Sequence, residues 1–95
     1  MVEPLDPVTA KGLARQALEV GRVIFDDHVR ARMIQRKITL VDVYRILRAG
    51  APQQAELDNG TWRYPLTSPS LTVCYAFRRW EPITISIVTV IRHGR

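Results

Sequence analysis

The sequence predicts an α+β domain in which two or three N-terminal helices pack on a small antiparallel sheet of three to five strands. Apolar residues at helical spacing are confined to the part of the chain before Gly50. After Gly50 the pattern changes to short extended runs, separated by the turn sequences Asp58-Asn59-Gly60 and Ser68-Pro69-Ser70. Helices followed by strands, without repeats, indicate an α+β layer architecture. A chain of 95 residues has the length of one domain, so we expect a single domain over residues 1–95.

The first expected helix covers residues 9–20, with Thr9 as its N-cap and Gly21 as its end. Pro4 and Pro7 disfavour a helix before it, so residues 1–7 are expected to form a flexible tail. The β-branched run Arg22–Phe25 that follows indicates a short edge strand or a bridge.

Two further helices are expected before Gly50. Asp26 and Asp27 are suited to cap a helix over residues 28–35, because acidic side chains favour a helix N-terminus. The sequence Thr39-Leu40-Val41-Asp42 is a capping box, and it opens the best-defined helix of the chain.

Four extended segments are expected after Gly50, over residues 53–57, 61–66, 71–79 and 83–92. The third alternates, with Leu71, Val73, Tyr75 and Phe77 on one face and Thr72, Cys74, Ala76 and Arg78 on the other. The fourth becomes apolar on both faces, which is typical of a central strand.

Charge is the most informative feature of the composition. Twelve arginines and two lysines stand against nine acidic residues, which gives a formal charge of +5. Arginine meets a phosphate with two parallel hydrogen bonds and keeps its charge. A GC-rich genome would also favour arginine over lysine, but it would not produce the net excess. The composition therefore indicates a polyanionic partner, with RNA ahead of the alternatives.

The sequence also limits compartment and cofactors. Cys74 is the only cysteine, which excludes an internal disulfide and a cysteine-based zinc site. The N-terminus lacks the basic and apolar segments of a signal peptide, and the longest apolar run is too short to cross a bilayer. Nucleotide-binding and metal-binding motifs are absent. We expect a cytoplasmic protein with no cofactor, no metal and no membrane partner.

A cationic stripe, His28, Arg32 and Arg36, lies on one face of the second expected helix, because its members are four residues apart. Like charges at this spacing cost roughly a few tenths of a kcal/mol in an isolated helix. An RNA phosphate would offset that cost, so these residues are candidate RNA contacts. The alternative interpretation is a solvated face, or arginines paired with carboxylates elsewhere.

Other cations lie beside aromatic residues at the strand ends: Arg63 between Trp62 and Tyr64, Arg78 and Arg79 before Trp80, and Arg92 and His93 at the end of the last strand. Charge next to a stacking surface is the combination that single-stranded RNA favours, so Arg78 and Arg79 are further candidate RNA contacts. The alternative is that strand ends expose arginine while the tryptophans fill the core.

Metal-free cleavage of RNA is the chemistry that these residue types permit. The substrate's own 2′-OH attacks the neighbouring phosphate, and the protein supplies a proton acceptor, a proton donor and a cation for the phosphate oxygens. Tyrosine, histidine and arginine can fill these roles together.

The pattern His28-x-x-x-Arg32-Met33-x-x-Arg36-x-Ile38-Thr39-x-x-Asp42-Val43-x-x-x-Leu47-x-x-Gly50 resembles an uncharacterised bacterial and phage domain family grouped with the RelE/ParE-like toxins. It covers about a quarter of the chain. More distantly, the segments Gly21-Arg22-Val23 and Thr61-Trp62-Arg63 are similar to stretches of the MqsR-like mRNA interferases.

This resemblance implies a RelE/ParE-like fold and the toxin half of a type II toxin–antitoxin pair. It implies an mRNA endoribonuclease, acting on or off the ribosome, and a cognate antitoxin that covers its basic surface. Carried over by position, Arg63 contacts the substrate, Tyr75 lies near the scissile phosphate, and Arg92 is the basic residue of the last strand. The family carries glutamine and lysines where this chain has arginines. Arginine is a poor general base, so His93 or Tyr75 would move the protons.

Two other functions stay open. One is a non-catalytic basic binding module, either a nucleic-acid-binding regulator or a ParE-like inhibitor of a protein target such as gyrase. The other is a family member whose activity is lost. A binding module would keep the helical cations and would tolerate replacement of Tyr75 and His93.

Overall fold

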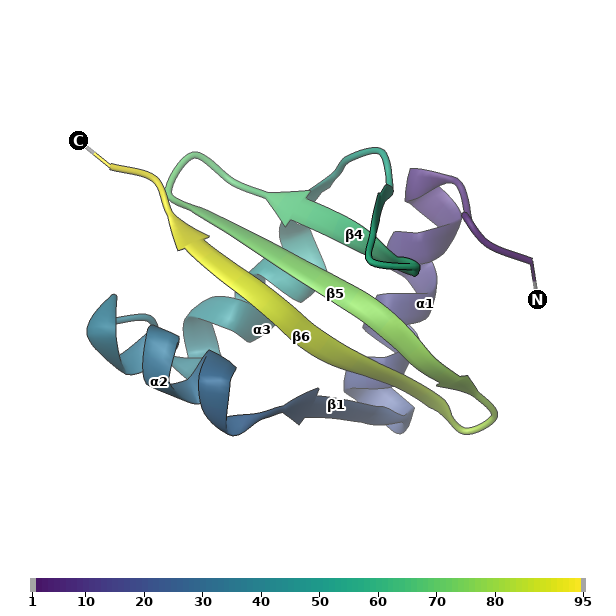
Figure 1. The fold of residues 1–95 in the computed structure, drawn as a ribbon, viewed down its shortest axis with the longest axis horizontal. Helices are drawn as coiled ribbons and strands as arrows, with labels where there is room; N and C mark the ends of the chain where they lie inside the picture. Colours follow the sequence, from purple (N-terminus) through teal and green to yellow (C-terminus); the bar gives the residue numbers. More distant parts are fainter. Residues whose placement is uncertain (1, 95) are drawn as a thin grey trace.

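The computed structural model describes residues 2–94 and has the α+β architecture that the sequence predicts (Figure 1). The elements in chain order are α1 (Pro7–Val20), β1 (Arg22–Phe25), α2 (Asp27–Gln35), α3 (Leu40–Ala49), β2 (Ala51–Pro52), β3 (Glu56–Asp58), β4 (Thr61–Thr67), β5 (Leu71–Trp80) and β6 (Ile83–Arg92). No helix within residues 2–94 has the length and apolar character needed to cross a bilayer.

The sheet has six strands, in the order β1-β6-β5-β4-β2 with β3 paired to β4, so the expectation of three to five strands is wrong. The segment expected as one strand over residues 53–57 is replaced by two very short strands. One pairs Ala51 with Thr67 and the other pairs Glu56 with Arg63. Runs of two or three residues are too short to show a period of their own, so only pairing with β4 defines them.

β1 pairs in parallel with β6, and all other strand pairs are antiparallel. A parallel pair requires a crossover connection, which the chain from α2 to β5 provides. The pairing of β1 with β6 ends at Phe25 and its partner Ile87, because the chain leaves β1 after Phe25 and enters α2. β6 is therefore a central strand in its first half, and α2 lies beside its second half (Figure 1).

The start of α1 differs from the expected one. The helix begins at Pro7 and is capped by Asp6, whose side chain accepts a 3.1 Å hydrogen bond from the Thr9 amide, so Thr9 is not the N-cap. Proline suits the first position of a helix because its missing N–H would have no partner there. The residues before α1 lie against β4, where the Tyr64 hydroxyl donates a 2.7 Å hydrogen bond to Glu3.

The caps of the other two helices agree with the sequence. Asp26 caps α2, which begins one residue earlier than expected. Thr39 and Asp42 form the capping box at α3, with reciprocal hydrogen bonds of 2.8 and 3.1 Å. Hydrogen bonding to Thr39 also lowers the pKa of Asp42 from its ordinary value. Gly50 ends α3 next to the Ile46 carbonyl, where a Cβ would meet that oxygen at only 2.7 Å.

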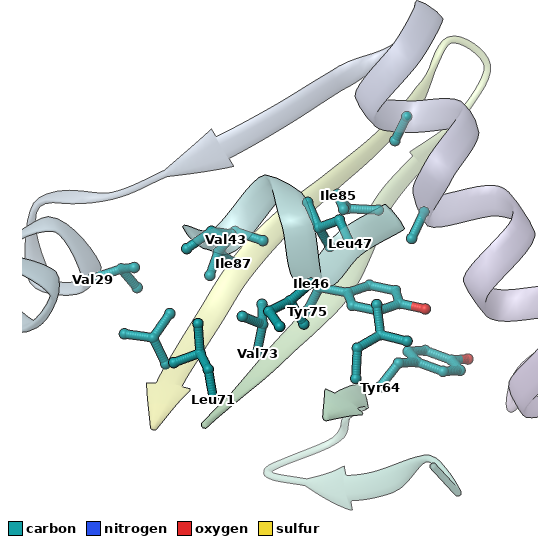
Figure 2. Packing of buried hydrophobic residues seen from close by; sticks show 14 of the residues in the cluster. Val29, Val43, Ile46, Leu47, Tyr64, Leu71, Val73, Tyr75, Ile85 and Ile87 are labelled. Carbon is teal, nitrogen blue, oxygen red and sulfur yellow. The ribbon is translucent and has the colours of Figure 1, made fainter. Parts of the chain in front are cut away.

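α1 and α3 pack on one face of the sheet (Figure 1), and the core lies between these helices and the strands. Side chains from α3 meet alternate side chains of the central strands there (Figure 2). Strand alternation sends the intervening residues, among them Thr72, Cys74 and Ser86, to the opposite face. We call this second face the open face, because no helix of residues 2–94 covers it (Figure 1).

Candidate nucleic-acid interface

Strand geometry separates the arginines from the aromatic residues that neighbour them in the sequence. Tyr64 is buried, with its ring stacked on Tyr75 at 5.5 Å, and Trp80 stacks on Phe77 at 4.8 Å against the core. Adjacent residues of a strand point to opposite faces, so Arg63 points away from these rings. The aromatic residues beside these arginines therefore pack in the core, as Tyr64 does, or lie partly buried against it, as Trp62 and Trp80 do.

Tyr75 lies in the core and not beside a substrate. Only 1% of its surface is exposed, and its ring packs among the residues under α3 (Figure 2). Burial raises the pKa of its hydroxyl above the ordinary tyrosine value. So little of Tyr75 is exposed that the structure does not support the catalytic role expected for its hydroxyl.

Arg92 binds the end of a helix. Its Nε donates a 2.9 Å hydrogen bond to the Arg36 carbonyl and its Nη2 a 2.7 Å hydrogen bond to the Lys37 carbonyl, where α2 has ended. In return, Arg36 Nη1 donates to the Val90 carbonyl of β6. These two arginines form a clasp between α2 and β6. Cations at a helix C-terminus are favourable because the last carbonyls lack helical partners.

Replacing Arg92 with alanine is expected to lower the free energy of unfolding by about 1–2 kcal/mol, because two charge-assisted hydrogen bonds at an exposed site are lost. Arg92→Lys restores the charge but not the two-pronged geometry, so it should recover only part of the loss. Urea denaturation measures both. Equal stability of wild type and Arg92→Ala would contradict the clasp.

The four residues expected to form a cleavage site are not brought together. His93 lies at the end of β6, with its Nε2 2.7 Å from the Thr72 hydroxyl. Arg63 lies on the β3–β4 hairpin and is paired with Asp58 at 3.0 Å. Arg63 lies four positions before Thr67, a second neighbour of His93, and four positions along β4 are roughly 13 Å at the strand rise.

The cationic stripe of α2 faces β6. His28, Arg32 and Arg36 line a hollow of about 200 Å³ together with Val29 and the β6 residues Val88, Thr89 and Val90. We call this hollow the α2–β6 groove. His28 and Arg32 are exposed, whereas Arg36 is half-buried and held on β6 by the clasp. The stripe is therefore neither a purely solvated face nor paired with carboxylates, and it forms one wall of a groove.

A second cationic hollow lies at the other end of β6, and we call it the corner hollow. It has a volume of about 290 Å³ and is lined by Arg22, Ile24, Arg78, Arg79, Pro82 and Thr84. A register shift between Phe77 and Arg79 interrupts the pairing of β5 with β6 at this point. Arg78 and Arg79 are both exposed, and Arg78 Nε donates a 2.8 Å hydrogen bond to the Ser86 hydroxyl.

Arg22 was not among the residues singled out from the sequence. It reaches the corner hollow because β1 pairs in parallel with β6 and places Arg22 opposite Thr84. The segment Arg22–Phe25 was recognisable as a strand, but neither its neighbour nor its register can be inferred from its own residues. Only the pairing joins Arg22 to Arg78 and Arg79.

No aspartate or glutamate of the described residues lines either hollow. The ion pairs within residues 2–94 are Arg15 with Glu19, and Arg63 with Asp58, so no described carboxylate offsets the charge of the arginines in the two hollows. Thr84 and Val88 bound the gap along β6, so at the strand rise the hollows lie roughly 13 Å apart. The geometry suits an extended polyanion better than one small anion.

Comparisons of the chain with protein-family models, with curated proteins and with solved structures find no match. The likeness to RelE/ParE-like toxins therefore stays a prediction, and the functional argument rests on this chain's own residues. Within residues 2–94, no three side chains of histidine, cysteine, aspartate or glutamate gather closely enough to hold a metal ion.

Proposed function

We propose that the protein binds RNA by its phosphate backbone, with the α2–β6 groove and the corner hollow as the two points of contact. One observation carries the proposal: two hollows along β6 are lined by cations, and no described carboxylate lies in either. Of the five cations predicted to contact RNA, Arg36 is occupied by the clasp. The other four, His28, Arg32, Arg78 and Arg79, lie at one or other hollow, and Arg22 is the fourth arginine, beside Arg78 and Arg79 in the corner hollow.

The chemistry of the hollows favours phosphates over bases. Arginine binds a phosphate through two parallel N–H groups, and each neutralised phosphate also releases condensed counterions. Base stacking needs exposed aromatic rings, whereas Tyr64, Tyr75, Phe77 and Trp80 pack in or against the core. Binding should therefore depend strongly on charge and weakly on base sequence.

Fluorescence anisotropy with labelled single-stranded RNA, measured over a range of salt concentrations, tests the proposal. Four arginines in contact predict that the logarithm of the binding constant falls with the logarithm of salt with a slope of about −3. Because the hollows are roughly 13 Å apart, about four nucleotides at ~3.4 Å each are needed to reach both. Oligonucleotides of about 12 nucleotides should therefore bind much more tightly than those of about 2.

A slope near zero, or equal affinity for the short and the long RNA, would contradict binding across both hollows. The same titration with duplex DNA separates an RNA-binding protein from a DNA-binding regulator. A ParE-like inhibitor of a protein target would bind neither nucleic acid at physiological salt. An endoribonuclease toxin would need, in addition, a proton-transfer group beside a bound phosphate.

A further inference from the structure

We infer that the α2–β6 groove is a site of metal-free RNA cleavage, with His28 as the proton-transfer residue and Arg32 as the ligand of the scissile phosphate. The inference rests on the proposed RNA binding and goes beyond it, because binding alone needs no histidine. It also moves the chemistry away from Tyr75, Arg92, His93 and Arg63, which do not share a site.

The positions of these two side chains are set by one helix. His28 and Arg32 lie one turn apart on α2, and both line the groove against Val88, Thr89 and Val90. The next member of the stripe, Arg36, is hydrogen-bonded to the Val90 carbonyl, which fixes the face of α2 that is turned to β6. A phosphate held by Arg32 would therefore lie within reach of the imidazole one turn away.

The two histidines of the chain differ in their surroundings. The His93 imidazole is engaged with the Thr72 hydroxyl at 2.7 Å and lines neither cationic hollow. His28 is exposed, lies in the groove, and no side-chain hydrogen bond of residues 2–94 occupies its ring. Histidine is the side chain that exchanges protons most readily near neutral pH, so His28 is the one placed to act on a bound RNA.

The step is an internal transesterification. His28 accepts the proton of the ribose 2′-OH, and the 2′ oxygen forms a bond to the adjacent phosphorus. The bond from phosphorus to the 5′ oxygen of the next nucleotide breaks, and that oxygen takes a proton from a water molecule. The protonated His28 then returns its proton to the resulting hydroxide, so that His28 and the water are both restored. The products are a 2′,3′-cyclic phosphate and a 5′-hydroxyl. Arg32 donates to the non-bridging oxygens, where negative charge increases in the transition state.

The test compares wild type with His28→Ala, Arg32→Ala and the control His93→Ala on end-labelled RNA in excess chelator. Wild type and His93→Ala should give fragments with 2′,3′-cyclic ends, identified by mass spectrometry. With protein in saturating excess over RNA, His28→Ala should reduce the single-turnover rate by about 10²–10⁴-fold, the usual contribution of an acid–base group. RNA with 2′-O-methyl riboses should bind and remain intact.

Three results would overturn the inference. RNA that wild type binds but leaves intact removes the catalytic site and leaves the proposed binding in place. Cleavage that survives in His28→Ala, or that is lost in His93→Ala, removes His28 from the step. Absence of RNA binding removes both proposals together. Equal melting temperatures for the two histidine variants, followed by circular dichroism, ensure that a lost rate is not a lost fold.

Discussion

Replacing Arg32, Arg78 and Arg79 with alanine is expected to weaken RNA binding by more than about tenfold and to reduce the salt slope from about −3 to about −1. These residues have no carboxylate partner within residues 2–94, and of the four arginines expected to bind RNA only Arg22 would remain. Arg36 is left in place because its contact with the Val90 carbonyl is structural. Anisotropy titrations at several salt concentrations give both quantities.

The matched control is the triple variant Arg15→Ala/Arg45→Ala/Arg48→Ala. It removes the same net charge, but its arginines lie on α1 and α3, outside the two hollows, and Arg45 and Arg48 line a separate hollow on α3. Arg15 forms an exposed ion pair with Glu19, and such pairs contribute little to stability. The control should keep most of the affinity and slope of wild type. Equal losses in the two triple variants would show that total charge, and not the hollows, governs binding.

Replacing Tyr75 with alanine is expected to reduce the free energy of unfolding by about 3–5 kcal/mol, because a fully buried aromatic side chain is removed and a cavity remains. This is a large part of the ~5–15 kcal/mol that stabilises a typical domain. The stack on Tyr64 and the edge contact with Phe77 would both be lost. Denaturation by urea measures the change.

Tyr75→Phe separates a core role from a catalytic one. It keeps the ring and removes only the hydroxyl, for which no hydrogen bond is found within residues 2–94. We expect a stability change below about 1 kcal/mol, together with unchanged RNA affinity. If phenylalanine at this position abolished cleavage while the fold was kept, the hydroxyl would have to be reachable, contrary to its burial.

The predictions that held are those decided by residues close together in the chain. The capping box of Thr39 and Asp42, the cap at Asp26 and the end of α1 at Gly21 all involve contacts within four residues. Such contacts form wherever the segment lies in the fold, so the sequence predicts them directly. The Asp6 cap was missed because Pro7 was taken as a helix breaker and not as the first helical residue.

The candidate site was predicted in part. The spacing of His28, Arg32 and Arg36 placed them on one helical face, and the structure turns that face to β6. Arg78 and Arg79, predicted to contact RNA, are exposed, but the neighbouring Phe77 and Trp80 pack against the core and offer little stacking surface beside them. Alternation along a strand separates adjacent residues, and that rule was available from the sequence.

The sequence by itself determined the α+β class, the helices and their caps, and the excess of arginine, because these depend on local spacing and composition. The tertiary structure decided what these arginines contact. Packing of α2 against β6 joined Arg36 and Arg92 in a clasp and left Arg32 in a groove, and pairing of β1 with β6 placed Arg22 in the same hollow as Arg79. These contacts join residues about 50 or more positions apart, and which of them form depends on strand order and register. Neither the strand order nor the register can be inferred from the spacing of residues within one segment.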